Sequence, residues 1–350
     1  TKEAVGHKCA VATRFSVGLE DSESYDAFAL LAELPDLWDL VVPDYGVEMG
    51  ASRFVKEASF TDSIAKAKAL TSKPVVAVGR FTSPDTMAQV IRQGGQDLIG
   101  AARPSIADPF LPQKIDEGRS EDIRECIGCN ICYAHDSLGV PLRCTQNPTM
   151  GEEWRQGWHP EKAGRSKTPE KVLVVGAGPA GLEAARVLGE RGHSVMLAEA
   201  NRTLGGRVTR ESRLPGMREW ARVRDWRLGQ IDKLANVEVY PESPLEAADV
   251  LDLGVTHVIA ATGAVWATDT IGRHSATGLE EEAPGMLVSA ETVLNGEALN
   301  ADHVVIYDDD HYYLGSVLAL QLPAAWSRWR SGPIQMAQSG FRLPSAGFSA

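Results

Sequence analysis

The chain of 350 residues has few cysteines, no long hydrophobic run and no excess of positive charge. Its five cysteines are too few for a disulfide-stapled fold, and no stretch of about 18 apolar residues predicts a membrane span. The 35 basic and 47 acidic residues give a net charge of −12, which argues against a nucleic-acid partner. The first residues lack the layout of a secretion signal. We therefore expect a cytoplasmic protein with neither a membrane nor a nucleic-acid partner.

The first 125 residues alternate short apolar strands with helical patterns. Continuous apolar strands joined by helices indicate a parallel sheet that is covered on both sides. Four such units would form half of an eightfold α/β barrel, the TIM barrel. The expected strands cover residues 9–15, 38–42, 74–79 and 97–101, and the expected helices cover residues 24–34, 60–70 and 84–93.

A second α/β region is expected after the Lys-, Pro-, Gly- and Ser-rich segment 159–171. It reaches to about residue 300, and a further strand is expected at 303–307 to open a third unit. From residue 323 to 350 the sequence has neither helical nor strand periodicity, so we expect no regular structure there. The first strands of the second region are predicted at 172–175, 194–198 and 258–261.

A glycine-rich turn of the form G-x-G-x-x-G follows strand 172–175 and precedes a predicted helix at 182–191. Such a turn lets the backbone approach a pyrophosphate at the helix N-terminus, and Glu199 ends the next strand, where a carboxylate binds a ribose. The alternative is a glycine-rich turn without a ligand. We predict a Rossmann-like domain that binds ADP or FAD through Gly176, Gly178, Pro179, Ala180, Gly181, Glu199, Ala200, Gly206, Arg207, Thr262 and Gly263.

Four of the five cysteines follow the pattern C-x₂-C-x₂-C-x₁₁-C. In a reducing compartment this clustering favours metal binding over disulfides. Three thiolates from one loop and a distant fourth are typical of a 4Fe–4S cluster, whereas zinc sites usually pair two C-x₂-C arms. The predicted ligands are Cys126, Cys129, Cys132 and Cys144, and Cys9 is expected to be a bystander.

The last two predicted strands of the first region end in Gly79-Arg80 and Ala102-Arg103. Loops after the last two strands of such barrels commonly bind a phosphate through backbone N–H groups and a basic side chain. These residues would then hold a flavin phosphate. Arg14, at the end of the first strand, would place a positive charge beside the flavin ring. For each arginine, a surface ion pair is the alternative.

Segments 100–110, 125–130, 144–148 and 157–162 resemble the trimethylamine, dimethylamine and histamine dehydrogenases, relatives of old yellow enzyme and 2,4-dienoyl-CoA reductase. The resemblance covers residues 9 to about 321. It implies FMN in a TIM barrel, a 4Fe–4S cluster, and ADP or FAD at the Gly176 turn. It also implies oxidation of a small amine, with electrons passed to an electron-transferring flavoprotein, and a homodimer when intact.

The segment from Asp308 to Gly315 distinguishes two branches of these relatives. An NAD(P)H-dependent dienoyl-CoA or enoate reductase needs a glycine-rich turn there, whereas this chain has three aspartates and two tyrosines that would repel and obstruct a pyrophosphate. Amine oxidation is therefore favoured. The reductase remains one alternative, and an inactive nucleotide-binding, electron-transfer remnant is another.

Three residues are candidates for the substrate site. Asp136 stands where the trimethylamine dehydrogenases have a tryptophan, and a carboxylate suits a primary amine or a protonated imidazole. The family has Asp-Trp and, three residues later, an Asp that orients an active-site histidine. Tyr45 would fill the place of that Trp and Glu48 the place of the later Asp, although Glu48 could equally be a solvated loop residue.

The resemblance also implies a chain cut at both ends, because the family's FMN-tethering cysteine and its catalytic tyrosine and histidine have no counterpart here. We expect the following parts: residues 1–125, the C-terminal half of the barrel; 126–168, the cluster segment and linker; 169–300, the ADP- or FAD-binding domain; 301–322, the start of a degenerate nicotinamide-type domain; and 323–350, an aberrant tail.

Overall fold

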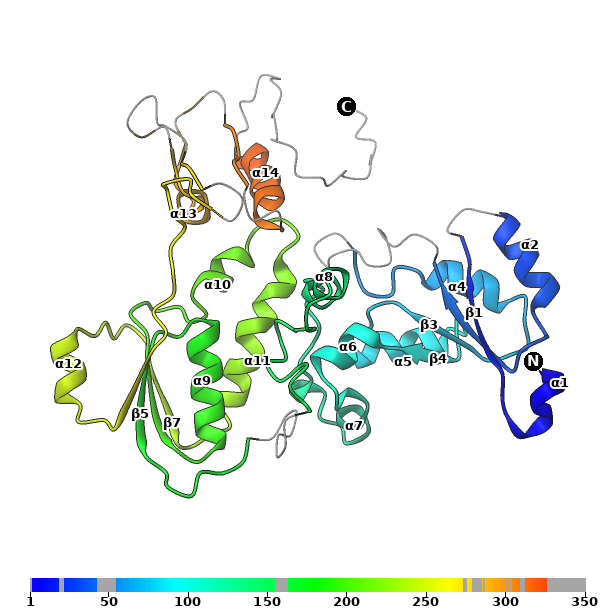
Figure 1. Ribbon diagram of the computed structural model, residues 1–350, viewed down its shortest axis with the longest axis horizontal. Coiled ribbons are helices and arrows are strands. Elements are labelled where there is room, and N and C mark those ends of the chain that lie inside the picture. The colour runs from blue at the N-terminus through cyan, green and yellow to red at the C-terminus, as the bar shows by residue number, and fades with distance from the viewer. Residues whose placement is uncertain are drawn as a thin grey trace.

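The computed structural model describes residues 2–18, 22–42, 55–154, 163–272, 276–278, 285, 287–299, 301, 304–308 and 312–325. Two parallel four-stranded sheets form its framework, and short helices and loops connect them (Figure 1). This is an α/β protein with parallel sheets, as the sequence predicts. None of the helices in the described residues is both long and apolar enough to cross a membrane.

The first sheet has the strand order β1-β2-β3-β4, and every pair is parallel. Its strands are close to those expected, with ends that differ by a few residues. The strands are β1 (Ala12–Ser16), β2 (Leu37–Val41), β3 (Val75–Val78) and β4 (Leu98–Gly100), and the helices are α1 (Lys2–Val5), α2 (Ser22–Leu31), α4 (Thr61–Lys68), α5 (Pro84–Arg92) and α6 (Ala102–Ala107).

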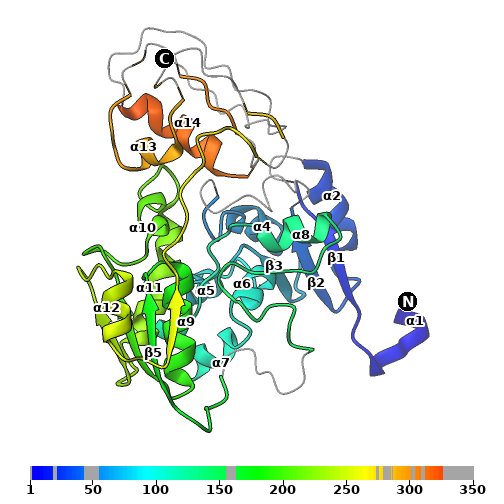
Figure 2. The same cartoon turned by 60° about the vertical axis from the view of Figure 1, so that its left-hand side comes forward.

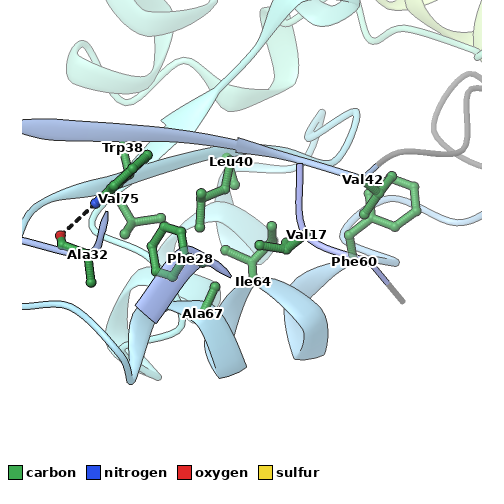
Figure 3. Packing of buried hydrophobic residues seen from close by; sticks show 11 residues of the cluster. Val17, Phe28, Ala32, Trp38, Leu40, Val42, Phe60, Ile64, Ala67 and Val75 are labelled. Atoms are coloured by element: carbon green, nitrogen blue, oxygen red, sulfur yellow. Dashed lines mark hydrogen bonds between the residues drawn. The ribbon is translucent and has the colours of Figure 1, made fainter. Parts of the chain in front are cut away.

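Trp38 on β2 is at the centre of the core of this first unit (Figure 3). Its ring packs against Phe28 of α2, with the ring centroids 4.8 Å apart, and against Phe15 of β1 at 5.9 Å. The indole N–H donates a 2.8 Å hydrogen bond to the carbonyl of Ala32, which satisfies the polar edge of a buried ring. Ile64 of α4 completes the contact. The core therefore fixes α2 and α4 on one face of the sheet.

The second sheet has the order β7-β6-β5-β8, again with every pair parallel. Helices α9 and α11 pack together beside it, and the apolar positions of α9, such as Leu182 and Ala185, are buried against β5 and β6. The strands are β5 (Lys171–Val175), β6 (Ser194–Ala198), β7 (Val237–Tyr240) and β8 (His257–Ala260), and the helices are α9 (Pro179–Glu190), α10 (Arg207–Glu211), η3 (Arg218–Trp220), α11 (Ala221–Ile231) and α12 (Ala247–Asp252).

Between the two sheets lie α7 (Leu111–Asp116), η2 (Ser120–Asp122) and α8 (Ile131–Ser137) (Figure 1). The Trp226 indole of α11 donates a 3.0 Å hydrogen bond to the carbonyl of Asp122, so this connecting segment is attached to the second unit. Helices α13 (Ala290–Leu294) and α14 (Leu314–Ala325) lie beyond α10 (Figure 2).

Two expectations about the C-terminal part are wrong. Residues 304–308 pair with no strand in the described structure: Ile306 packs on an apolar cluster, whereas Val305 is 73% exposed. Regular structure also does not end before Pro323, because α14 continues to Ala325. The apolar face of α14, with Val317 fully buried, holds that helix in place. Residues 326–350 lie outside the described residues.

Candidate cofactor sites

The glycine-rich turn joins β5 to α9, as predicted. A side chain is excluded at Gly176, where φ is +100° and a Cβ would lie 2.4 Å from the carbonyl oxygen of Ala261. A Cβ at Gly181 would lie 1.8 Å from the carbonyl oxygen of Gly176, so only glycine allows this approach of helix to turn. At Gly178, by contrast, a Cβ would meet no atom within 4 Å. The turn thus leaves open space at the N-terminus of α9, where a pyrophosphate would bind.

Glu199 ends β6 and points back into the turn. Its carboxylate accepts hydrogen bonds from the Ala177 N–H at 2.8 Å and from the Asn201 N–H at 2.9 Å. Burial acts to raise the pKa of Glu199, but these bonds and one from the Ala200 N–H outweigh it and lower that pKa. Glu199 is therefore an anion that braces the turn, and a carboxylate retains further acceptor positions for a ribose.

The loop before α10 closes on the same turn. The Gly205 N–H donates a 2.8 Å hydrogen bond to the Ala177 carbonyl, and a Cβ on Gly206 would lie 3.1 Å from the Cα of Gly178. Arg207, the next residue, donates a 2.6 Å bond to the carbonyl of Ala264 and lies over the ring of Trp266. This arginine therefore links α10 to the loop after β8.

The remaining predicted nucleotide residues lie on exposed backbone near the turn. Pro179 and Ala180 open α9 and are exposed, as are Thr262 and Gly263, which follow β8. β8 is the direct neighbour of β5, so both pairs lie at the same edge of the sheet. The structure therefore brings the predicted nucleotide residues to one region.

The four clustered cysteines lie between residue 126 and residue 144, on the loop before α8, on α8 and on the loop after it. All four are unpaired thiols, and Cys129 interacts electrostatically with each of the other three. Burial raises the pKa of Cys126 to about 11, and it also raises those of Cys132 and Cys144. In the described residues, no three His, Cys, Asp or Glu side chains are grouped closely enough to bind one metal ion.

The surroundings of these thiols suit anionic sulfur. The Gly128 N–H donates to the Cys126 sulfur at 3.4 Å, and the backbone N–H groups of Asn147 and Gln146 act to lower the pKa of Cys144 against the effect of its burial. Hydrogen bonds of this kind, together with nearby cations, stabilise the thiolates of an iron–sulfur cluster. Four soft ligands with such donors therefore fit the predicted 4Fe–4S group.

Arg80 and Arg103 follow the neighbouring strands β3 and β4. Arg80 is buried, has a φ of +51°, and donates a 3.0 Å bond to the carbonyl of Val55. Burial lowers the pKa of Arg80, and the like charge of Arg103 lowers it further. Cationic side chains at adjacent strand ends of a barrel are groups of the kind that bind an oxyanion. Gly79 precedes Arg80, and Ala102 opens α6 before Arg103.

Glu57 organises the loop that contains Arg80, a role that no sequence pattern indicates. One carboxylate oxygen accepts hydrogen bonds from the N–H groups of Thr82 at 2.7 Å and Ser83 at 3.2 Å. The other oxygen accepts a 3.0 Å bond from the Thr86 hydroxyl. Glu57 therefore holds the turn after β3 in the conformation that positions Arg80.

Arg14 forms an ion pair across the sheet. It lies opposite Asp39 in the β1–β2 register, its Nη2 is 2.7 Å from the Asp39 Oδ2, and its side chain is 68% exposed. This is the ion pair that the sequence left open as an alternative. Asp136 is exposed on α8, and Tyr45 and Glu48 lie outside the described residues.

Tyr312 and Tyr313 contact the cluster loop and α10, which the sequence did not predict. The Tyr312 hydroxyl donates to the carbonyl of Cys129, and the Tyr313 hydroxyl donates a 2.9 Å bond to the buried carboxylate of Glu211. Burial raises the pKa of both Glu211 and Tyr313. Tyr312 therefore docks the residues before α14 onto the cysteine-bearing loop, and Tyr313 docks them onto α10.

Comparison with known proteins divides the chain in the same way. Residues 1–122 match the NADH:flavin oxidoreductase / NADH oxidase family, and residues 171–242 match the FAD dependent oxidoreductase family. The chain is 44% identical over 326 residues to dimethylamine dehydrogenase of Hyphomicrobium sp. (strain x), covering 89% of this chain and 44% of that protein.

Two solved structures share the arrangement. Histamine dehydrogenase from Rhizobium sp. 4-9 is 48% identical with a TM-score of 0.85, covering 93% of this chain and 48% of that one. The 6-hydroxypseudooxynicotine amine oxidase from Pseudomonas geniculata N1 is 46% identical with a TM-score of 0.88, covering 93% and 50%. The chain thus spans about half the length of the relatives it matches.

Proposed function

Because the chain belongs to the trimethylamine/dimethylamine/histamine dehydrogenase family, we propose that it is part of a flavin enzyme that oxidises a small amine. In this proposal residues 1–125 form the C-terminal half of an FMN-binding barrel and residues 126–168 form the cluster segment. Residues 169–300 hold ADP or FAD. Residues 301–322 start a degenerate nicotinamide-type domain. The electron acceptor is an electron-transferring flavoprotein, and the intact enzyme is a homodimer.

One contact carries the proposal: the 2.6 Å hydrogen bond from Arg103 to the Asn130 side chain. Arg103 belongs to the proposed FMN phosphate site, and Asn130 lies between Cys129 and Cys132. The residues proposed to hold the flavin phosphate and those of the cluster loop are therefore directly bonded, which supports neighbouring sites for the two groups in one chain.

Each proposed group would supply a distinct chemistry. When bound, FMN would supply a hydride acceptor for oxidation of the carbon beside the amine nitrogen, and a 4Fe–4S cluster would supply a one-electron carrier. The chain's own residues would bind and orient these groups. Arg80 and Arg103 would hold the FMN phosphate, and the four cysteines would bind iron. The oxidised substrate is an imine, which water hydrolyses to an aldehyde and ammonia or a smaller amine.

The substrate is proposed to be a histamine-type primary amine or a methylated amine. An anionic Asp136 would accept hydrogen bonds from the N–H groups of a primary ammonium or an imidazolium. Tyr45 and Glu48 are proposed for the same site, and Arg14 for the flavin ring. Relatives that act on histamine and on dimethylamine are both similar to this chain at more than 40% identity.

Anaerobic titration of the FMN-loaded intact enzyme that contains this chain tests this function. Adding histamine or dimethylamine should bleach the flavin absorbance, whereas NADPH alone should leave it unchanged. Bleaching by NADPH alone would instead identify a reductase. The matched variants are Arg103→Gln, which should lose FMN, and Arg92→Gln, an exposed position on α5 that should retain it.

A further inference from the structure

Three arginines surround the indole of Trp226 on α11. The guanidinium carbons of Arg124, Arg186 and Arg227 lie 5.1, 5.3 and 5.9 Å from the ring centroid. All three arginines are buried, with exposed fractions of 1%, 5% and 3%. Buried cations must be paired. Such a cluster is costly, so each arginine needs a specific partner.

Arg186 and Arg227 share one carboxylate but differ in their other partners. Glu183 of α9 accepts a 2.5 Å bond from Arg186 and a 2.8 Å bond from Arg227. The remaining terminal nitrogen of Arg186 bonds to Glu190, within the same helix. Arg227 instead reaches out of its own unit to the loop that carries Cys144.

Arg227 binds Gln146 at two points. Its Nη1 donates a 3.1 Å bond to the side-chain oxygen of Gln146, and its Nη2 donates a 3.2 Å bond to the Gln146 main-chain carbonyl. Gln146 is only 1% exposed, and its amide in turn donates to the carbonyl of Glu125 at 3.1 Å. A planar fork that binds both ends of one residue fixes its position and its orientation.

The position of Gln146 matters because of Cys144, two residues earlier. The clamp on the side chain and carbonyl of Gln146 therefore holds the backbone that directly follows Cys144. The Arg227 guanidinium also interacts electrostatically with Cys144. Groups that orient a metal ligand in this way typically contribute about 10–100-fold to metal affinity.

We propose that Arg227 is a positioning residue for the fourth cysteine ligand of the cluster: it clamps Gln146 and so fixes the backbone that orients Cys144, and its charge raises the reduction potential. Glu183 holds Arg227 in place, and Glu183 lies on the helix that starts at the nucleotide-binding turn. This inference rests on the proposed cluster at the four cysteines.

The test compares Arg227→Gln, Arg227→Lys and Arg186→Gln in the anaerobically purified full chain. Iron and acid-labile sulfide, the rate of iron loss to a chelator, and the midpoint potential are measured for each. Arg186→Gln is the matched control, because Arg186 is equally buried, contacts the same ring and pairs with the same Glu183. Thermal unfolding followed by circular dichroism identifies a variant that has lost its fold.

Arg227→Gln should lose iron at least about tenfold faster than the unaltered chain and have a lower midpoint potential. Arg227→Lys keeps the positive charge but cannot make the two-point contact with Gln146. Its midpoint potential should therefore match that of the unaltered chain, whereas its iron should still be lost faster. This variant tests the proposal if Arg227→Gln does not fold. If Arg186→Gln alters iron loss and midpoint potential as much as Arg227→Gln does, or if Arg227→Gln behaves like the unaltered chain, the positioning role of Arg227 is overturned while the cluster stands. An unaltered chain without iron and sulfide would overturn the cluster and this role together.

Discussion

Two substitutions in the glycine-rich turn, at Gly181 and at Gly178, should separate an effect on folding stability from an effect on ligand binding. In Gly181→Ala the new Cβ would lie 1.8 Å from the Gly176 carbonyl oxygen, against a usual minimum of 3.0 Å, so the helix and the turn must separate by 3.0 − 1.8 = 1.2 Å. Overpacking of this kind, against rigid backbone, costs about 3 kcal/mol or more. Alanine's better helix propensity returns about 1 kcal/mol. We therefore expect a net loss of about 2 kcal/mol or more in the free energy of unfolding.

Gly178→Ala has the opposite pattern. A Cβ there meets no protein atom within 4 Å, and the backbone angles, φ −72° and ψ −179°, suit alanine. The free energy of unfolding should be unchanged or higher by about 0.4–1 kcal/mol. The same methyl group would occupy the space of a pyrophosphate, and a clash of about 1–3 kcal/mol weakens ADP binding about 5- to 150-fold.

Urea unfolding and isothermal titration with ADP measure the two effects on the same samples. The expected result is a destabilised Gly181→Ala and a stable Gly178→Ala that binds ADP poorly. Unaltered ADP affinity in Gly178→Ala would refute the assignment of the turn as a pyrophosphate site. A stable Gly181→Ala would refute the close approach of helix and turn.

Three further predictions concern the core, acid stability and the loop before α5. Trp38→Ala should cost about 3–5 kcal/mol in urea unfolding, whereas Trp154→Ala, 76% exposed, should cost little; similar losses would contradict the core assignment. Burial acts to raise the pKa of Asp122, but bonds from Lys233, Gln230 and Arg119 lower it to about 2. The ionised Asp122 therefore stabilises the fold above its unfolded pKa of about 3.9, and this stabilisation is lost as the pH falls toward 2. After solvent screening the stabilisation is about 1 kcal/mol. Asp122→Asn should abolish this pH dependence in urea unfolding. Glu57→Gln, which removes charge-assisted bonds to the Arg80 loop, should weaken FMN binding about tenfold in a fluorescence titration, and unchanged affinity would contradict that role.

The parts of the fold that local sequence determines were predicted well. The run from Val172 through Gly181 combines an apolar strand, spaced glycines and a helix, and the structure has β5, the turn and α9 there. The strand expected at 303–307 failed because an apolar run needs a hydrogen-bonding neighbour, and the described residues provide none. β7 was missed because Val237–Tyr240 alternates apolar and polar residues over only four positions, which is too short a pattern to indicate a strand by itself.

The candidate sites likewise divide into residues that a local pattern identifies and residues that depend on distant contacts. The cysteines and glycines were identifiable because their chemistry is tied to spacing. The ion-pair partner of Arg14 could not be identified from sequence, since Asp39 is 25 residues away and is brought opposite only by the sheet register. Arg227 likewise meets Gln146 across 81 residues. No local pattern encodes such contacts, because they depend on how two separate units pack.

We propose that this chain binds a flavin and an iron–sulfur cluster through directly connected residues. Iron and acid-labile sulfide in the anaerobically purified chain test it most directly, with Cys126→Ser and Cys9→Ser as the variant and its matched control. We predict about four iron and four sulfide per chain, lost in Cys126→Ser and kept in Cys9→Ser. Zinc without sulfide, or iron that survives Cys126→Ser, would contradict the account.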